Sequence, residues 1–275
     1  MWSLFGMHLE VEQMTKMKLQ TAIEQQVATG GKAFIPYIMA GDGGLQKLRE
    51  QLLFLQESGA TAVELGIPFS DPVADGPTIQ EAGKRALTSG VTLRGVLEEI
   101  VSLRNEVTIP IVLMTYLNPV FRYGIEKFAQ DCAEAGVSGL IVPDLPLEES
   151  PMVKDEFSKY DLALVQLVSL TSPQERIERI AKASEGFLYA VTVTGITGAR
   201  AEFAANVGEH LAKLKEVSPV PVMAGFGIST PEQVREMGKL ADGVIVGSRI
   251  VDALHDENYD CISELIAASK AVEIV

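Results

Sequence analysis

Cysteines, long apolar runs and clusters of basic residues are all scarce in this sequence of 275 residues. The two cysteines, Cys132 and Cys261, stand far apart without CxxC or Cys/His spacing, which argues against a disulfide framework or a zinc knuckle. No run of about 18 apolar residues occurs, so no transmembrane span is expected. The formal net charge of -14 and the lack of Lys and Arg clusters argue against nucleic-acid binding. A soluble protein is therefore predicted.

The first 20 residues lack the pattern of a targeting segment. Glu10 and Glu12 stand among scattered apolar positions, with neither a charged-then-apolar signal layout nor an Arg-rich transit composition. A reducing, cytoplasmic location is therefore expected.

Eight short, largely apolar runs alternate with longer stretches of helical period, as expected of consecutive βα units. The predicted strands are Ala33–Met39, Ala62–Ile67, Ile109–Met114, Gly139–Val142, Ala163–Leu167, Phe187–Val191, Val220–Ala224 and Gly243–Val246. Continuous apolar runs favour a parallel sheet covered by helices. Eight units favour closure into a (β/α)8 TIM barrel, an α/β fold, as one domain over residues 1–275. A doubly wound open sheet is the rival, but Gly41-Asp42-Gly43-Gly44 does not match its GxGxxG phosphate loop.

The segments between the strands show helical signals. Phe121, Ile125, Phe128 and Cys132 are spaced as one apolar stripe that faces the core. Ser172-Pro173 and Thr230-Pro231 each place a capping hydroxyl before a proline, and they are predicted to start helices five and seven. Residues 1–30 exceed what the barrel needs; they are predicted to form an N-terminal extension, a helix over the barrel bottom with a frayed start, and no function is assigned to them.

Carboxylates mark the end of the second strand, and active sites of barrels lie at the C-terminal ends of the strands. Glu64 stands inside an apolar run, where burial would raise its pKa into the range of a general acid/base. Asp75, in the following loop, could face it across a pocket and remain ionised. A structural carboxylate at Glu64 fits the strand pattern equally well, and Asp71 and Asp75 could each simply cap a turn or a helix.

Glycines follow three successive strands near the end of the chain. They occur in Gly225-Phe226-Gly227 after strand seven, in Gly247-Ser248 after strand eight, and in Gly195 to Gly198 after strand six. In barrels such exits bind phosphate through backbone N–H groups, and the two glycines after strand six also suit a mobile lid. A phosphorylated substrate is therefore predicted.

Several chemistries lack their residues. No predicted strand contains a lysine for a Schiff base, and His8, His210 and His255 are widely separated, so neither a Schiff-base aldolase nor a histidine-bound metal is expected. Cofactor-free acid/base chemistry on a small phosphorylated molecule remains.

The run from Glu64 through Ser70-Asp71-Pro72 and on from Ala74 to Gln80 resembles the signature of the tryptophan synthase α subunit family. The resemblance extends over about residues 33–255 and includes six further positions or motifs. They are Met114–Pro119, Val142–Pro146, Tyr189, Gly195 to Gly198, Gly225–Ile228 and Gly247-Ser248.

This resemblance implies cleavage of indole-3-glycerol phosphate into indole and glyceraldehyde 3-phosphate, with Glu64 as proton shuttle and Asp75 steadying the indole N–H. It implies a phosphate site at Gly198, Gly227, Gly247 and Ser248, and an indole pocket lined by Tyr37, Met114 and Tyr189. It also implies no metal or cofactor on this chain, and an α2β2 complex in which indole passes to a pyridoxal-phosphate (PLP) β subunit. The contact is expected near Asp71-Pro72 and the Gly195 to Gly208 loop.

The chain departs from the family at two positions, Gly43, where many relatives have proline, and Val193, where some have arginine. A stand-alone indole-3-glycerol-phosphate lyase would share every motif, while a non-catalytic phosphate-binding barrel subunit is disfavoured because Glu64 and Asp75 are both kept. Other phosphate-binding barrels, an isomerase of histidine biosynthesis or indole-glycerol-phosphate synthase, are predicted to carry a strand-end Lys or a second phosphate motif, which this sequence lacks.

Overall fold

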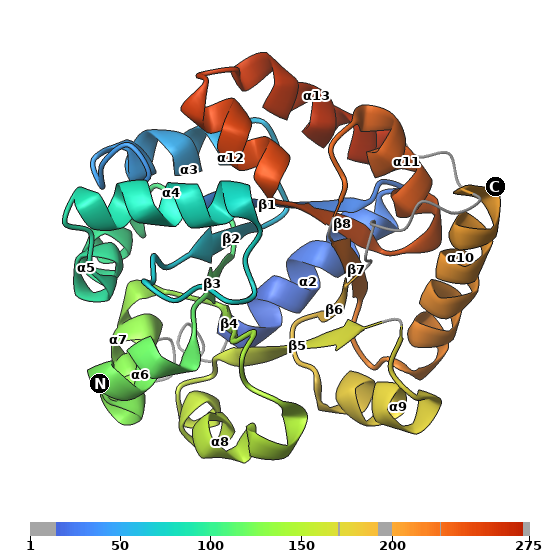
Figure 1. The fold of residues 1–275 in the computed structure, drawn as a ribbon, viewed down its shortest axis with the longest axis horizontal. Coiled ribbons are helices and arrows are strands. Elements are labelled where there is room, and N and C mark those ends of the chain that lie inside the picture. Colours follow the sequence, from blue (N-terminus) through green and yellow to red (C-terminus); the bar gives the residue numbers. More distant parts are fainter. Residues whose placement is uncertain (1–14, 170, 192–199, 226, 272–275) are drawn as a thin grey trace, which may run out of the picture.

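The computed structural model describes residues 15–169, 171–191, 200–225 and 227–271, in which eight parallel strands close into a barrel in sequence order (Figure 1). The strands are β1 (Ala33–Met39), β2 (Val63–Gly66), β3 (Ile111–Met114), β4 (Gly139–Ile141), β5 (Ala163–Ser169), β6 (Leu188–Val191), β7 (Val222–Gly225) and β8 (Gly243–Val246). β1 pairs with both β2 and β8, which closes the ring. The predicted (β/α)8 barrel is confirmed, and the open sheet is excluded.

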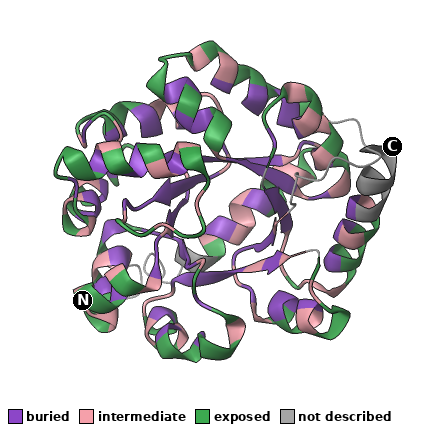
Figure 2. Cartoon of the chain, in the orientation of Figure 1, coloured by how far each residue is buried: buried purple, intermediate pink, exposed green. Residues whose placement is uncertain are grey.

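Helices surround the strands, and their buried sides face the barrel while their exposed sides face outward (Figure 2). They are α2 (Thr15–Ala28), α3 (Lys47–Glu57), α4 (Pro77–Thr88), α5 (Leu93–Leu103), α6 (Leu117–Tyr123), α7 (Ile125–Ala135), η1 (Leu147–Glu149), α8 (Pro151–Lys159), α9 (Gln174–Ala183), α10 (Arg200–Val217), α11 (Pro231–Leu240), α12 (Ser248–His255) and α13 (Tyr259–Lys270). Among the described residues no helix is long and apolar enough to cross a membrane.

The N-terminal helix α2 closes the end of the barrel at which the strands begin, and it lies across the ring in Figure 1. Leu19 and Ile23 are fully buried and cluster with strand residues such as Ile35 and Val165. A Cβ at Gly186 would lie 2.6 Å from Leu19 Cδ2, and Gly186 has φ +73°, so this position excludes a side chain for two reasons. α2 therefore leaves only the opposite end of the barrel open.

The predicted apolar stripe from Phe121 to Cys132 is interrupted. Gly124 adopts φ +95° and separates α6 from α7. Phe128 and Cys132 on α7 are fully buried, whereas Phe121 on α6 is 43% exposed. The prediction of a single face was wrong because the left-handed glycine changes the direction of the helix axis between the two halves of the stripe.

The two predicted caps have different outcomes. Thr230 forms a capping box with Gln233 at the start of α11, as predicted. Ser172 caps nothing: α9 begins at Gln174 after an extended Pro173, without a side-chain cap, and the Ser172 N–H donates to the Ser169 carbonyl in a turn. That prediction was wrong because Pro173 lies before the first helical turn and not within it.

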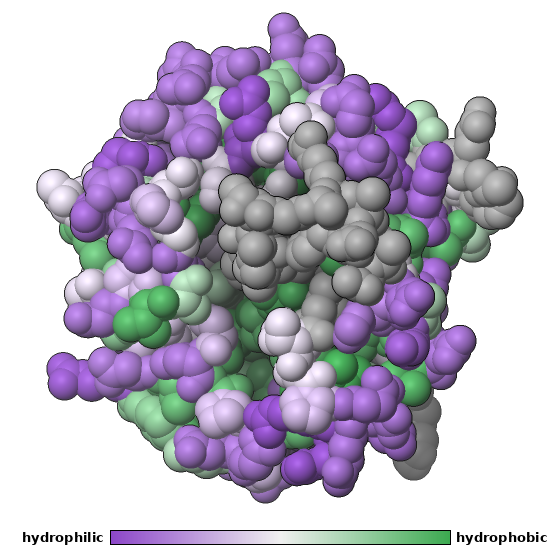
Figure 3. Space-filling model, turned by 45° about the vertical axis from the view of Figure 1, so that its right-hand side comes forward, coloured by the Kyte–Doolittle hydropathy of each residue, from purple (hydrophilic) through white to green (hydrophobic). Residues whose placement is uncertain are grey.

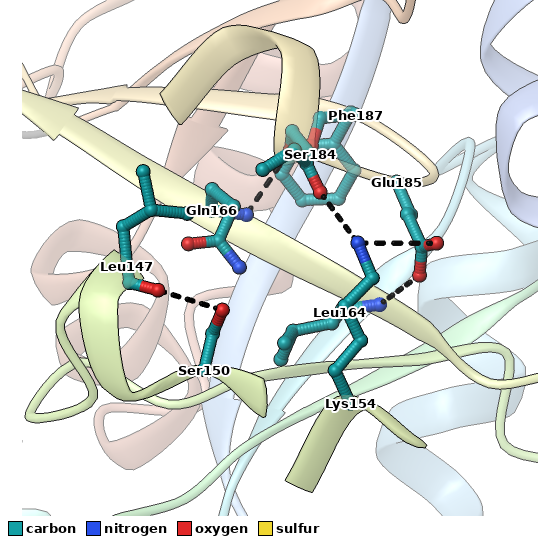
Figure 4. Close-up of polar contacts among 9 residues, drawn as sticks. Leu147, Ser150, Lys154, Leu164, Gln166, Ser184, Glu185 and Phe187 are labelled. Atoms are coloured by element: carbon teal, nitrogen blue, oxygen red, sulfur yellow. Dashed lines mark hydrogen bonds and ion pairs between the residues drawn. The ribbon is translucent and has the colours of Figure 1, made fainter. Parts of the chain in front are cut away.

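Side-chain hydrogen bonds join β5 to the turn that enters β6 (Figure 4). The Ser184 hydroxyl accepts from the Gln166 N–H at 3.0 Å and donates to the Phe187 carbonyl at 2.6 Å. Glu185 accepts from the Leu164 N–H at 3.1 Å. These contacts fix the start of β6, the strand that carries Tyr189.

A candidate active site at the open end of the barrel

A cavity of about 320 Å³ lies at the C-terminal ends of the strands. Figure 3 shows a face that is hollowed near its centre, with hydrophobic residues lining the visible part of the hollow. The cavity is lined by residues of β1, β2, β3, β6 and β8 and of the loops after β2, β7 and β8. Its lining includes the predicted site residues Tyr37, Glu64, Asp75, Met114, Tyr189, Gly227, Gly247 and Ser248.

Glu64 carries the most perturbed carboxyl group of the site. It is 1% exposed in the middle of β2, and among the described residues its Oε2 atom has no hydrogen-bond partner. Burial raises its pKa from 4.5 to about 8, and the nearby charge of Asp75 contributes to the rise. A buried carboxyl group without a hydrogen bond on one oxygen is costly to a protein, so a purely structural role explains it poorly.

Asp75 is held by its own backbone in the loop between β2 and α4. Its N–H donates to the Pro72 carbonyl at 3.1 Å, and its carbonyl accepts from Gln80 Nε2 at 2.8 Å. Partial burial raises the pKa of its side chain to about 6, while a hydrogen bond from Tyr116 opposes that rise. At neutral pH the site therefore contains one protonated and one ionised carboxyl group.

Tyr116 is a functional candidate that the sequence did not single out. It is buried just beyond β3; its hydroxyl accepts the Ala74 N–H at 3.0 Å and hydrogen bonds to the Asp75 carboxylate. One hydroxyl thus holds both the loop backbone and its acidic side chain. In the sequence, only the position of Tyr116 at a strand exit, as with the candidate carboxylates, could have indicated this role.

Two tyrosines from separate strands shape the cavity, and each lies over a glycine of the next strand. A Cβ at Gly66 would meet the Tyr37 hydroxyl at 2.0 Å, and a Cβ at Gly225 would meet Tyr189 Cε1 at 2.5 Å. Any larger residue at either glycine would displace its tyrosine ring. The flat aromatic walls therefore depend on these glycines.

The loops after β7 and β8 form the other end of the cavity. α12 begins directly after Gly247, so the N–H groups of Ser248 and Arg249 lie in its first turn, where no carbonyl of the helix can accept them. After β7, Gln233 Oε1 accepts the N–H groups of Ser229 and Thr230. An anion bound here would use the N–H groups of α12 and of the loop residues before Ser229.

Arg249 also lines the cavity, a feature that was not predicted from the sequence. Gly198 and Val193, named from the sequence, lie outside the described residues. Within the described part of the chain no group of three or more His, Cys, Asp or Glu side chains could hold a metal ion.

Comparison with known proteins identifies the family. Residues 23–273 match the model of the family described as tryptophan synthase alpha chain. The tryptophan synthase alpha chain of Bacillus cereus is 55% identical over 256 residues, which are 93% of this chain and 98% of that protein. That of Bacillus mycoides is 57% identical over 244 residues, which are 89% and 95% of the two chains. This chain belongs to the tryptophan synthase alpha chain family.

Solved structures agree with this membership. Tryptophan synthase of Mycobacterium tuberculosis superposes with a TM-score of 0.84 at 36% identity, over 92% of this chain and 98% of that chain. Tryptophan synthase subunit alpha from Legionella pneumophila gives 0.83 at 35% identity, over 91% and 97%. The resemblance inferred from the sequence is confirmed, and with it the assignment to the lyases that cleave indole-3-glycerol phosphate in tryptophan biosynthesis.

Proposed function

We propose that Glu64 and Asp75 perform the reaction of this family, cofactor-free cleavage of indole-3-glycerol phosphate to indole and glyceraldehyde 3-phosphate. One observation carries the proposal: two carboxyl groups line one cavity, and their environments separate their pKa values to about 8 and about 6. A pair of titratable groups tuned apart in this way is suited to divide acid and charge-stabilising roles.

Protonation of the indole ring is the first chemical step. Glu64 is protonated at neutral pH and donates its proton to the ring carbon that bears the glycerol chain, which leaves an iminium-like ring. The positive character that develops at the indole nitrogen is stabilised by the ionised Asp75, which Tyr116 holds in place. Both charges act inside a largely buried cavity, where their interaction is stronger than in water.

Carbon–carbon cleavage follows from the same two residues. The Glu64 carboxylate formed in the first step removes the proton of the hydroxyl next to the bond that breaks. The oxygen electrons form the aldehyde of glyceraldehyde 3-phosphate, and the electrons of the broken bond return to the ring to give indole. Glu64 ends the cycle protonated, so the step needs no oxidant, reductant or cofactor.

The substrate spans the cavity between these groups. Its phosphate binds the backbone at Gly227, Gly247 and Ser248, with Gly198 as a further member outside the described residues. The guanidinium of Arg249 adds local positive charge at the phosphate in a chain whose formal net charge is -14. Tyr37, Met114 and Tyr189 enclose the indole ring.

A β subunit that carries PLP completes the enzyme as an α2β2 complex in the cytoplasm and receives the indole. Similar solved structures are those of tryptophan synthase from M. tuberculosis, which supports this pairing. The expected contacts are the loop at Asp71-Pro72 and the Gly195 to Gly208 loop, the start of which lies outside the described residues. On the first of these, Val73 is 84% exposed next to Ala74, which lines the cavity.

The test is to follow glyceraldehyde 3-phosphate release by the purified chain, with and without a β subunit. Glu64→Gln and Asp75→Asn should each lose at least a hundredfold in kcat, while Glu98→Gln on the exposed face of α5 should not. Slow cleavage that the β subunit accelerates supports the α2β2 assignment. Fast cleavage without it indicates a stand-alone lyase, and full activity of Glu64→Gln contradicts the proposed mechanism.

A further inference from the structure

Tyr37 brings a phenolic hydroxyl into the layer of side chains that contains Glu64. The two residues are direct partners in the β1–β2 register, and both line the cavity. The ring extends along the barrel interior until its hydroxyl lies over Gly66, two residues beyond Glu64 on the same face of β2. The hydroxyl group therefore lies beside the part of β2 that presents the Glu64 carboxyl group.

Both of these polar groups have unused hydrogen-bonding capacity. Between described residues, the Tyr37 hydroxyl makes no hydrogen bond, and Tyr37 lines the cavity, although the residue as a whole is only 5% exposed. Glu64 Oε2 likewise has no partner among them. The buried Glu64 oxygen therefore lacks a donor, and the Tyr37 hydroxyl on the wall of the same cavity is able to supply one.

The other hydroxyls and charges around Glu64 are committed elsewhere. Tyr116 is engaged with the loop at Ala74 and Asp75. Tyr189 comes from β6, on the opposite side of the ring, and its phenol lies over Gly225, although the charge of Glu64 also raises its pKa. Arg249 stands on α12 at the phosphate end, and Asp75 can only accept a hydrogen bond once it is ionised. Tyr37 is the donor that the β1–β2 register places directly beside Glu64.

Tyr37 also keeps its proton throughout the working range of the enzyme. Burial raises the pKa of the phenol well above 10, and the charges of Asp75 and Glu64 raise it further. A neutral phenol beside carboxylates acts as a hydrogen-bond donor to them.

We propose that Tyr37 is a positioning residue, whose hydroxyl donates a hydrogen bond to the Glu64 carboxylate once Glu64 has delivered its proton. The bond holds the carboxylate towards the substrate hydroxyl that it must deprotonate, and it lessens the unfavourable effect of an ionised group in the barrel. This role rests on the proposed function of Glu64. It adds to the aromatic wall that the ring of Tyr37 supplies, since a phenylalanine would provide that wall equally well.

Tyr37→Phe separates the hydroxyl from the ring. In the complex with a β subunit, kcat and KM for indole-3-glycerol phosphate are measured from pH 5 to 10 for the wild type, for Tyr37→Phe and for Tyr259→Phe. The last removes a surface hydroxyl that contacts Glu50. Without the donor, the Glu64 carboxylate is less stable, so the alkaline limb of kcat should move up by about one pH unit, a tenfold change in the ionisation constant. We expect kcat at pH 7 to fall about tenfold while KM changes less than twofold.

The outcomes separate the alternatives. An unchanged kcat profile overturns the role of Tyr37, as does a rise in KM alone, which would mean that the residue only lines the pocket. A shift of the acidic limb assigns the hydroxyl to Asp75 and also overturns it. Infrared titration of the Glu64 carboxyl group, with Glu64→Gln as the difference reference, gives the same comparison without turnover. If Glu64→Gln is fully active, the proposed function fails first, and that result is distinguishable from a failure of Tyr37 alone.

Discussion

Glu64 should make the folded protein progressively less stable as the pH rises, and Glu64→Gln should remove that loss. The folded state holds the Glu64 proton up to a pKa of about 8, whereas the unfolded chain releases it near 4.5. Between these values the folded state binds more protons, so the free energy of unfolding falls with rising pH. The contribution is fully present below pH 4.5, is lost as pH rises to about 8, and then stays constant.

The magnitude follows from the same two values. At about 1.4 kcal/mol per pH unit, ionising Glu64 in the barrel costs about 5 kcal/mol of stability by pH 8.5. Glutamine has the same shape and cannot ionise. Urea unfolding of both proteins at intervals from pH 5 to 9 should therefore show the variant gaining about 4 kcal/mol relative to the wild type across that range, since part of the change has already occurred at pH 5. The constant difference caused by the amide cancels in this comparison. Parallel curves for the two proteins would refute a raised pKa and, with it, the assignment of Glu64 as the acid.

Three further results are expected. The pH profile of kcat should be bell-shaped, with an ascending limb near pH 6 and a descending limb near pH 8. These apparent pKa values belong to the Glu64 and Asp75 pair, and a flat profile over pH 5 to 9 would contradict the two-carboxyl mechanism. Tyr116→Phe should move the ascending limb to higher pH and lower kcat at pH 6, because the ionised Asp75 loses a donor; an unmoved limb in the same assay would remove Tyr116 from the site. Gly66→Ala should lower the free energy of unfolding by about 1–3 kcal/mol and raise KM, because the added Cβ displaces the Tyr37 ring. A urea midpoint and a KM equal to those of the wild type would show that Gly66 does not hold the Tyr37 ring in place.

The strands and the carboxylate pair could be predicted from the sequence because each has a local signature. Apolar runs bounded by helical periods located all eight strands, and the bounds of β1 and β8 agree to the residue. Glu64 stood out because a charged residue in such a run is anomalous. These features depend on neighbours in the chain, which a sequence displays directly.

The features that could not be predicted depend on contacts between distant segments or on a single backbone torsion angle. The hydrogen bond from Ala74 to Tyr116 joins the exits of β2 and β3, and nothing near either residue encodes it. The stripe through Phe121 failed because Gly124 adopts a positive φ, which the helical spacing of the apolar residues does not reveal. Ser172 has the composition of a helix cap, but the turn that it forms with Ser169 decides where α9 begins.

The helix that closes the barrel also constrains how the chain can be made. α2 is the first described helix to be synthesised. Its residue Leu19 packs against Gly139 and Gly186, and Gly186 is synthesised more than half the chain later. Until the later strands exist, Leu19 and Ile23 lack the core residues against which they pack, and β1 lacks β8, with which it pairs. Until the last strands have been synthesised, α2 must therefore stay exposed to solvent or form transient non-native contacts. Assembly of the ring is thus a late event that depends on both ends of the protein.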